Sequence, residues 1–93
     1  MMVTRAELTA YAEAHDHMLV FFDPPQYFDH AIVGLVYGHS QEPAVLYDER
    51  LVLEAMAHEM GEEEAREYFD FNTTGAYVGE HTPRFLLRPF DDD

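Results

Sequence analysis

The apolar run AIVGLVY at residues 31–37 constrains the fold more than any other stretch of the chain. It is rich in β-branched residues and does not alternate apolar with polar side chains, a pattern typical of a central strand covered on both faces. Gly34 interrupts the run at a position that suits a β-bulge or a close approach of another segment. Residues His39–Pro43 have the composition of a turn, and Ala44–Tyr47 can return beside the first strand. We therefore expect an antiparallel hairpin.

The segment before the hairpin predicts one helix and one short strand. Thr4 and Glu7 have the spacing of a capping box, in which each side chain satisfies a backbone amide at the start of a helix. The helix should cover residues 5–15. Its apolar face is expected to hold Leu8, Tyr11, Ala12 and His15. Residues Met18–Phe22 are apolar and stop at Asp23-Pro24-Pro25, so we expect a strand there.

Two consecutive helices are predicted after the hairpin. Asp48 is a favourable N-cap for a helix over residues 49–60, which Gly61 ends. Three glutamates at 62–64 then supply the negative charge that favours the first turn of another helix. One face of this second helix should carry Ala65, Tyr68, Phe69, Asn72 and Ala76. Gly79 is a plausible stop for it.

The chain should end in an extended segment that begins at Pro83 and forms an edge strand. With 93 residues, the chain is too short for a second core, so residues 1–93 are expected to form a single domain. The predicted class is α+β, with a small antiparallel sheet of three to four strands packed against about three helices.

Acidity is the extreme feature of the composition. Nineteen acidic residues face five basic ones, all of them arginine, which gives a net charge of −14. Such a charge repels nucleic acid and anionic membranes and favours basic partners. The chain has no cysteine, no apolar run long enough to span a bilayer and no signal peptide, so we expect a cytoplasmic protein without disulfides or thiol chemistry. Adaptation to a high-salt cytoplasm is an alternative explanation of the acidity.

The densest acidic segment is a candidate partner-binding surface. It contains Glu59, Glu62, Glu63, Glu64, Glu67 and Asp70. On a helix, residues 63, 67 and 70 share one face, with carboxylates about one turn (~5.4 Å) apart. This spacing approaches that of the phosphates along a nucleic-acid strand, which advance ~3.4 Å each. The hypothesis is a non-enzymatic decoy or inhibitor that mimics DNA and occupies the basic surface of a nucleic-acid-binding protein; a second copy of the chain is another candidate partner.

A motif near the C-terminus adds a resemblance. The run YFDFNTTGAYVGEHTPRF at 68–85 resembles a family of small uncharacterised proteins of bacteria and phages. These proteins share the approximate pattern E-A-x-E-[YF]-[FW]-x-F-N-x-x-G-A-[YW]-x-G-x-x-T-P, and the resemblance covers residues 29–85. The resemblance implies a small α+β domain carried on mobile elements, and it implies no catalytic residue. The principal motif positions here are Phe69, Asn72, Gly75, Tyr77, Gly79, Thr82 and Pro83.

Asn72 allows two interpretations of the same motif. A polar amide on the apolar face of a helix needs hydrogen-bond partners, because an unpaired buried amide costs about 1–3 kcal/mol. The preferred interpretation is structural, with Asn72 tying its helix to the hairpin or to the 79–83 turn. The alternative is a small-ligand or metal-binding site in the 72–81 region. That site would be lined by Asn72, Thr73, Tyr77, Glu80 and His81, with His30 as a further candidate.

Two histidine-containing segments have only part of a metal-binding pattern. HEMGE at 58–62 has Glu62 where the zinc motif needs a second histidine, and Gly61 interrupts the helix before it. In HDH at 15–17, the two imidazoles would diverge at the end of a helix. We therefore predict no metal, no cofactor and no catalytic residue.

Overall fold

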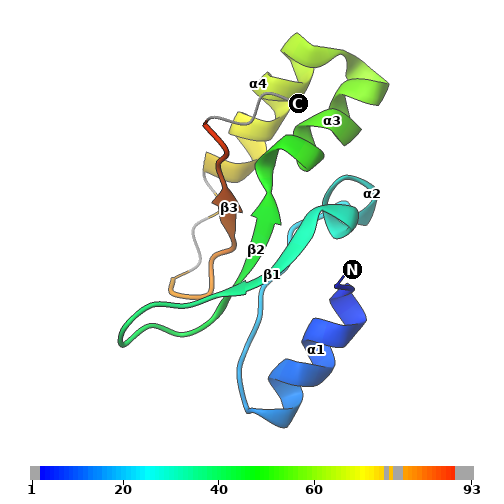
Figure 1. Cartoon of the computed structure of the whole chain (residues 1–93). Helices are drawn as coiled ribbons and strands as arrows, with labels where there is room; N and C mark the ends of the chain where they lie inside the picture. The colour runs from blue at the N-terminus through cyan, green and yellow to red at the C-terminus, as the bar shows by residue number, and fades with distance from the viewer. Residues whose placement is uncertain (1–2, 75, 77–78, 90–93) are drawn as a thin grey trace.

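The computed structural model describes residues 3–74, 76 and 79–89. The expected α+β class is confirmed: these residues form four α-helices, a short 3-10 helix and a three-stranded sheet. In chain order the elements are α1 (Arg5–Ala14), α2 (Pro25–Phe28), η1 (Asp29–Ala31), β1 (Ile32–Val36), β2 (Ala44–Asp48), α3 (Glu49–Met60), α4 (Glu62–Thr74) and β3 (Arg84–Leu86). Figure 1 shows α3 and α4 side by side at one end of the sheet and α1 at the other.

The hairpin forms as predicted, but its first strand is not central. β1 pairs antiparallel with β2, and the register shifts between Ile32 and Gly34, which places a bulge at the predicted glycine. The order of strands is β1-β2-β3, so β2 is the middle strand and β1 an edge strand. Val33 in β1 is 42% exposed, whereas β2 has four buried residues out of five. The apolar run at residues 31–37 therefore does not form the central strand of the sheet, as it was expected to do. The central, buried strand is β2.

The third strand changes the sheet from the expected antiparallel form to a mixed one. β3 lies parallel to β2, with Tyr47 opposite Phe85. Parallel neighbours need a long crossover connection. The chain leaves β2 into α3, returns along α4 and enters β3 from the end of the sheet where β2 begins (Figure 1). The prediction that β3 is an edge strand is confirmed.

Residues 18–22, predicted as a strand, belong to no helix or strand. Their place is set by side chains and not by a ladder of backbone hydrogen bonds. The backbone N–H of Phe22 donates to the hydroxyl of Tyr47 at 2.9 Å, and the Phe22 ring stacks on Tyr47 and Phe85. The prediction of a strand was therefore wrong: this apolar segment is partly buried through its side chains and pairs with no strand.

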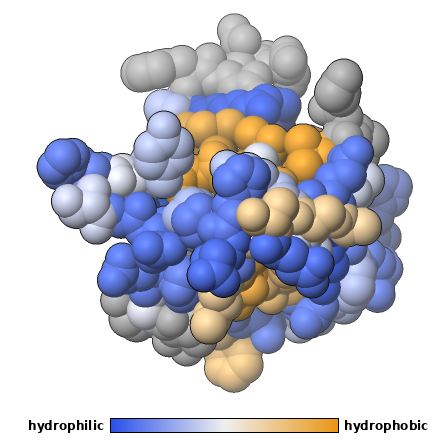
Figure 2. All heavy atoms as spheres, turned by 90° about the horizontal axis from the view of Figure 1, so that it is seen from below, coloured by the Kyte–Doolittle hydropathy of each residue, from blue (hydrophilic) through white to orange (hydrophobic). Residues whose placement is uncertain are grey.

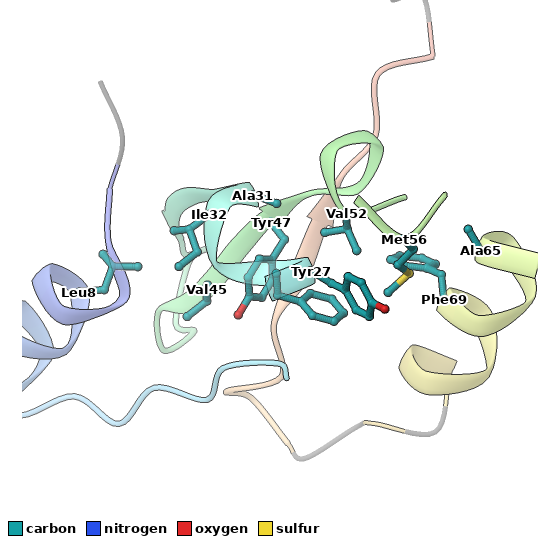
Figure 3. Close-up of a cluster of buried hydrophobic side chains, with 11 residues drawn as sticks. Leu8, Tyr27, Ala31, Ile32, Val45, Tyr47, Val52, Met56, Ala65 and Phe69 are labelled. Atoms are coloured by element: carbon teal, nitrogen blue, oxygen red, sulfur yellow. The ribbon is translucent and has the colours of Figure 1, made fainter. Parts of the chain in front are cut away.

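The core is centred on Tyr47 of β2, which is fully buried. Figure 3 shows the buried cluster as a row that runs from Leu8 on α1 to Ala65 and Phe69 on α4. Val52 and Met56 of α3 are also fully buried. Burial of side chains of this size contributes roughly 1.5–3 kcal/mol each, so this row is the main source of stability for the domain.

Helix α1 begins with the predicted capping box and ends one residue earlier than expected, at Ala14. Leu8 and Ala12 are buried, but Tyr11, predicted on the same face, is 43% exposed, and its ring lies against His15. The apolar stripe of α1 is therefore narrow. Arg5 ties the helix to the rest of the chain through Asp29 at 2.8 Å and the carbonyl oxygen of Phe22 at 2.9 Å.

Asp48 holds the junction of β2, α3 and the segment after β3. Its Oδ1 accepts the backbone N–H groups of Arg50 and Leu51, which confirms the predicted N-cap of a helix with the predicted bounds. Its Oδ2 lies 2.6 Å from Arg88 Nη2, and the Asp48 side chain is only 2% exposed. A buried carboxylate must be paired to be tolerated, so this ion pair fixes the end of β3 against the start of α3.

Candidate functional site

The acidic residues of α4 lie on the surface. Glu62, Glu63, Glu64, Glu67 and Asp70 are all exposed, while Ala65 and Phe69 on the opposite side are buried. This arrangement follows from the helical repeat of 3.6 residues, which places positions 63, 67 and 70 together and away from the core. The first turn also benefits from its three glutamates, since negative charge there offsets the helix dipole.

Two of the six predicted partner-binding carboxylates already have partners. Asp70 lies 3.4 Å from Arg66 of the same helix, and Arg66 also contacts Glu49 at 3.1 Å. Glu59 accepts a short hydrogen bond from the hydroxyl of Tyr27. No described residue forms an ion pair with Glu62, Glu63, Glu64 or Glu67. We call these four residues the α4 acidic face.

Exposed acids are not confined to that face. Others lie on α1, on α3 and on the connecting segments, at Glu7, Glu13, Asp16, Asp23, Glu42, Glu54 and Glu80. Seen from below, the surface is largely hydrophilic and encloses an apolar band (Figure 2). The acidic surface is therefore dispersed, and α4 is its densest part.

Asn72 does not tie its helix to the hairpin or to the 79–83 turn, so the sequence prediction was wrong. The residue is exposed, and its Nδ2 donates to the carbonyl oxygen of Tyr68 at 2.7 Å, within the same helix. Thr73 makes the equivalent bond to Phe69. The amide therefore bonds to the backbone of its own helix and not to the hairpin or to the 79–83 turn.

A hollow of about 290 Å³ lies beside the 79–83 turn. It is lined by Gln41, Gly79, Glu80, Thr82, Pro83 and Arg84. Arg84 donates to Gln41 at 3.3 Å, and the Thr82 hydroxyl donates to the carbonyl oxygen of Gly79 at 2.8 Å. Of the residues predicted to line a site in this region, Glu80 is in the wall. Gly75 and Tyr77 lie outside the described residues.

His81 is close to this hollow in sequence but does not line it. The residue is half-buried, and its Nδ1 has no hydrogen-bond partner among the described residues. Asn72 and Thr73 likewise belong to helix α4 and not to the wall. Of the predicted polar side chains that the structure describes, only Glu80 therefore lines this cavity.

Neither histidine-containing segment forms a metal site among the described residues, although the rings of His15 and His17 stack 6.4 Å apart and do not diverge as expected. His58 is exposed on α3, and Glu62 begins α4 after Gly61. His17 Nδ1 lies 3.3 Å from Glu42, while His15 Nδ1 lies 2.9 Å from the carbonyl oxygen of Tyr11. Within residues 3–74, 76 and 79–89, no group of three or more His, Asp or Glu side chains could hold a metal ion.

Two tyrosines have altered acidity. The hydrogen bond to Glu59, together with desolvation and the charge of that carboxylate, raises the pKa of Tyr27 to about 12. Burial raises the pKa of Tyr47 above its usual value, although its oxygen accepts the N–H of Phe22. Both groups are therefore neutral hydrogen-bonding groups at physiological pH and serve the core.

Sequence reasoning missed a second hollow, of about 220 Å³, where α3 begins. Its wall consists of Glu49, Arg50, Leu53, Arg66, Leu86, Leu87 and Arg88. We call it the arginine hollow, because three of the five arginines of the chain line it. These arginines are sixteen and twenty-two positions apart (66 − 50 and 88 − 66), so no local motif could have revealed it.

The comparisons with known proteins give no relative: no family model, curated protein or solved structure matches the chain. The resemblance to bacterial and phage proteins therefore stays a hypothesis. In the described part of the chain, every helix is too short or too polar to cross a membrane.

Proposed function

We propose that this protein is a non-enzymatic, cytoplasmic interaction protein that binds the basic, nucleic-acid-binding surface of another protein. The α4 acidic face is the contact, and the chain acts there as a decoy for nucleic acid. Its partners are recognised through their Lys and Arg side chains and not through a shared fold.

One observation supports this proposal above the others. Glu62, Glu63, Glu64 and Glu67 are exposed within one and a half helical turns, and no described residue pairs with them. Carboxylates held on a rigid helix keep their spacing, and the unpaired charges add to the field of a chain of net charge −14. A basic groove that releases counterions from nucleic acid would be attracted by the same field.

The test compares two variants with the same change in net charge. Glu63→Gln/Glu67→Gln removes charge from the α4 acidic face. Glu13→Gln/Glu80→Gln removes two exposed carboxylates elsewhere. The immobilised wild-type chain is exposed to bacterial lysate at low salt, the bound proteins are eluted with salt and identified, and each is purified. Their binding to duplex DNA is then measured by fluorescence anisotropy with and without each variant.

We expect the wild-type chain and the Glu13/Glu80 variant to displace the duplex, and the Glu63/Glu67 variant to lose at least tenfold in potency. The displacement should weaken steeply with salt, because exposed charges more than ~8 Å apart are screened at physiological ionic strength. An equal loss of potency in both variants would mean that the total negative charge, and not the α4 acidic face, displaces the duplex. Such a result would fit an acidity that is an adaptation to high salt. Partners that keep their hold on DNA while bound to this protein would contradict the decoy role.

A small-ligand site is a second candidate, favoured by the 290 Å³ hollow beside the 79–83 turn. Its wall offers one carboxylate, one guanidinium and one hydroxyl, from Glu80, Arg84 and Thr82. These groups suit a small polar molecule with both a donor and an acceptor. Saturation-transfer NMR with a library of polar fragments tests this candidate, and Arg84→Gln should abolish any signal that arises in this hollow.

A further inference from the structure

We propose that the arginine hollow binds a small organic monocarboxylate whose apolar body lies against leucine side chains. The site is separate from the α4 acidic face and takes a ligand of opposite charge. Three of the five arginines of the chain line it, and they come from α3, α4 and the segment after β3. Arginine presents several N–H donors in a planar fork that matches the two oxygens of a carboxylate.

Arg66 is the arginine most able to take a new acceptor. Its Nη1 and Nη2 contact Asp70 at 3.4 Å and Glu49 at 3.1 Å. Both distances exceed the ~2.7–2.9 Å of a strong charge-assisted hydrogen bond. The Arg66 side chain is 51% exposed, and exposed ion pairs of this kind are weak. A ligand carboxylate can therefore replace Asp70 without a large loss.

Arg88 gives the hollow a fixed wall. It is held 2.6 Å from the buried carboxylate of Asp48, so its guanidinium cannot move away without leaving that carboxylate unpaired. Arg50 lines the hollow at the start of α3, and its Nε lies 3.9 Å from Glu54. The wall thus combines one arginine that is held in place with two that belong to helices.

The apolar part of the wall selects the kind of anion. Leu53, Leu86 and Leu87 line the hollow, and Leu87 is 68% exposed. A ligand with a short hydrocarbon body would remove these side chains from water, which is favourable in proportion to the area covered. The volume of about 220 Å³ is below the ~300–1,000 Å³ of sites for drug-sized molecules. A small acid of about six carbons is the expected class.

A monoanion is favoured over a dianion such as phosphate. Glu49 is part of the wall, and the whole chain carries a net charge of −14, so each further negative charge on the ligand adds repulsion. Phosphate also has no apolar surface to place against the leucines. The site therefore differs from a phosphate-binding arginine cluster.

The test is a 1H–15N NMR titration of the full chain with hexanoate, acetate and inorganic phosphate. Hexanoate should give saturable shifts at Leu53, Arg66 and Leu87. Arg66→Gln should weaken hexanoate binding about tenfold, as expected for loss of one charge-assisted bond. The matched control is Arg84→Gln, which changes the net charge equally at the other hollow and should keep the affinity within about twofold. Circular dichroism shows whether each variant is folded.

Acetate tests the apolar wall, because it has the same carboxylate and almost no hydrocarbon. It should bind at least tenfold more weakly than hexanoate, and Leu87→Asn should narrow that difference. The proposal is overturned if hexanoate gives no saturable shifts, if acetate or phosphate binds as well as hexanoate, or if Arg84→Gln weakens binding as much as Arg66→Gln.

Discussion

Substitution of Arg88 by leucine should destabilise the protein by about 2 kcal/mol. Removing one partner of a fully buried ion pair costs about 3–5 kcal/mol. The Asp48 side chain is 2% exposed, but the Arg88 side chain is 41% exposed, so water can partly replace the lost guanidinium. Asp48 Oδ1 also keeps its two backbone donors, and only Oδ2 loses its partner. The loss of one hydrogen bond to a charged group, about 1.5–3 kcal/mol, is then the appropriate scale.

The N-cap makes Asp48→Ala more costly than Arg88→Leu. This variant loses the ion pair and also the cap of α3, which is typically worth ~1 kcal/mol, so we expect about 3 kcal/mol. The double variant should also cost about 3 kcal/mol and not the sum of the two, because both single changes remove the same interaction.

Urea unfolding followed by far-ultraviolet circular dichroism measures these free energies, with melting temperatures as a check. A loss of about 2 kcal/mol corresponds to a decrease of about 8–16 °C for a domain of this size. Arg84→Leu, at the exposed first residue of β3, is the control and should change stability by less than about 0.5 kcal/mol. An Arg88→Leu variant as stable as this control, or additive losses in the double variant, would refute the role of the pair.

Three further outcomes are expected. Gly61→Ala should destabilise by about 1–3 kcal/mol in the same urea assay, because φ 86° and ψ 162° are accessible almost only to glycine; an unchanged midpoint would contradict this. Tyr27 has a pKa of about 12 in the folded chain and about 10 when unfolded, so its contribution to stability is complete below pH 10 and is lost between pH 10 and 12. The free energy of unfolding of Tyr27→Phe should therefore decrease less across this pH range than that of the wild type. Parallel decreases in the two proteins would contradict this role of Tyr27. Asn72→Ala should change the melting temperature by only a few degrees, since the amide is exposed; a large decrease would restore the structural role predicted from the sequence.

Local signals in the sequence determined most of the elements. The capping box at Thr4 and Glu7, the N-cap at Asp48 and the break at Gly61 each depend on residues within one turn of the chain, so they could be read directly. The hairpin follows from a short turn between two apolar runs. Its bulge follows from the glycine at position 34. The outward position of Glu63 and Glu67 follows from helical periodicity alone.

Only the tertiary structure decided how these elements meet. The side of β2 on which β3 pairs, and its parallel direction, depend on the path of the chain through α3 and α4. That pairing made β1 an edge strand. The exposure of Asn72 depends on how α4 packs against the rest of the fold, and the arginine hollow depends on three segments meeting at one place. Such contacts join residues far apart in sequence, where no periodicity or capping signal connects them. Composition determined the net charge of the protein, whereas the fold determined which carboxylates form ion pairs with basic side chains and which remain unpaired and exposed on α4.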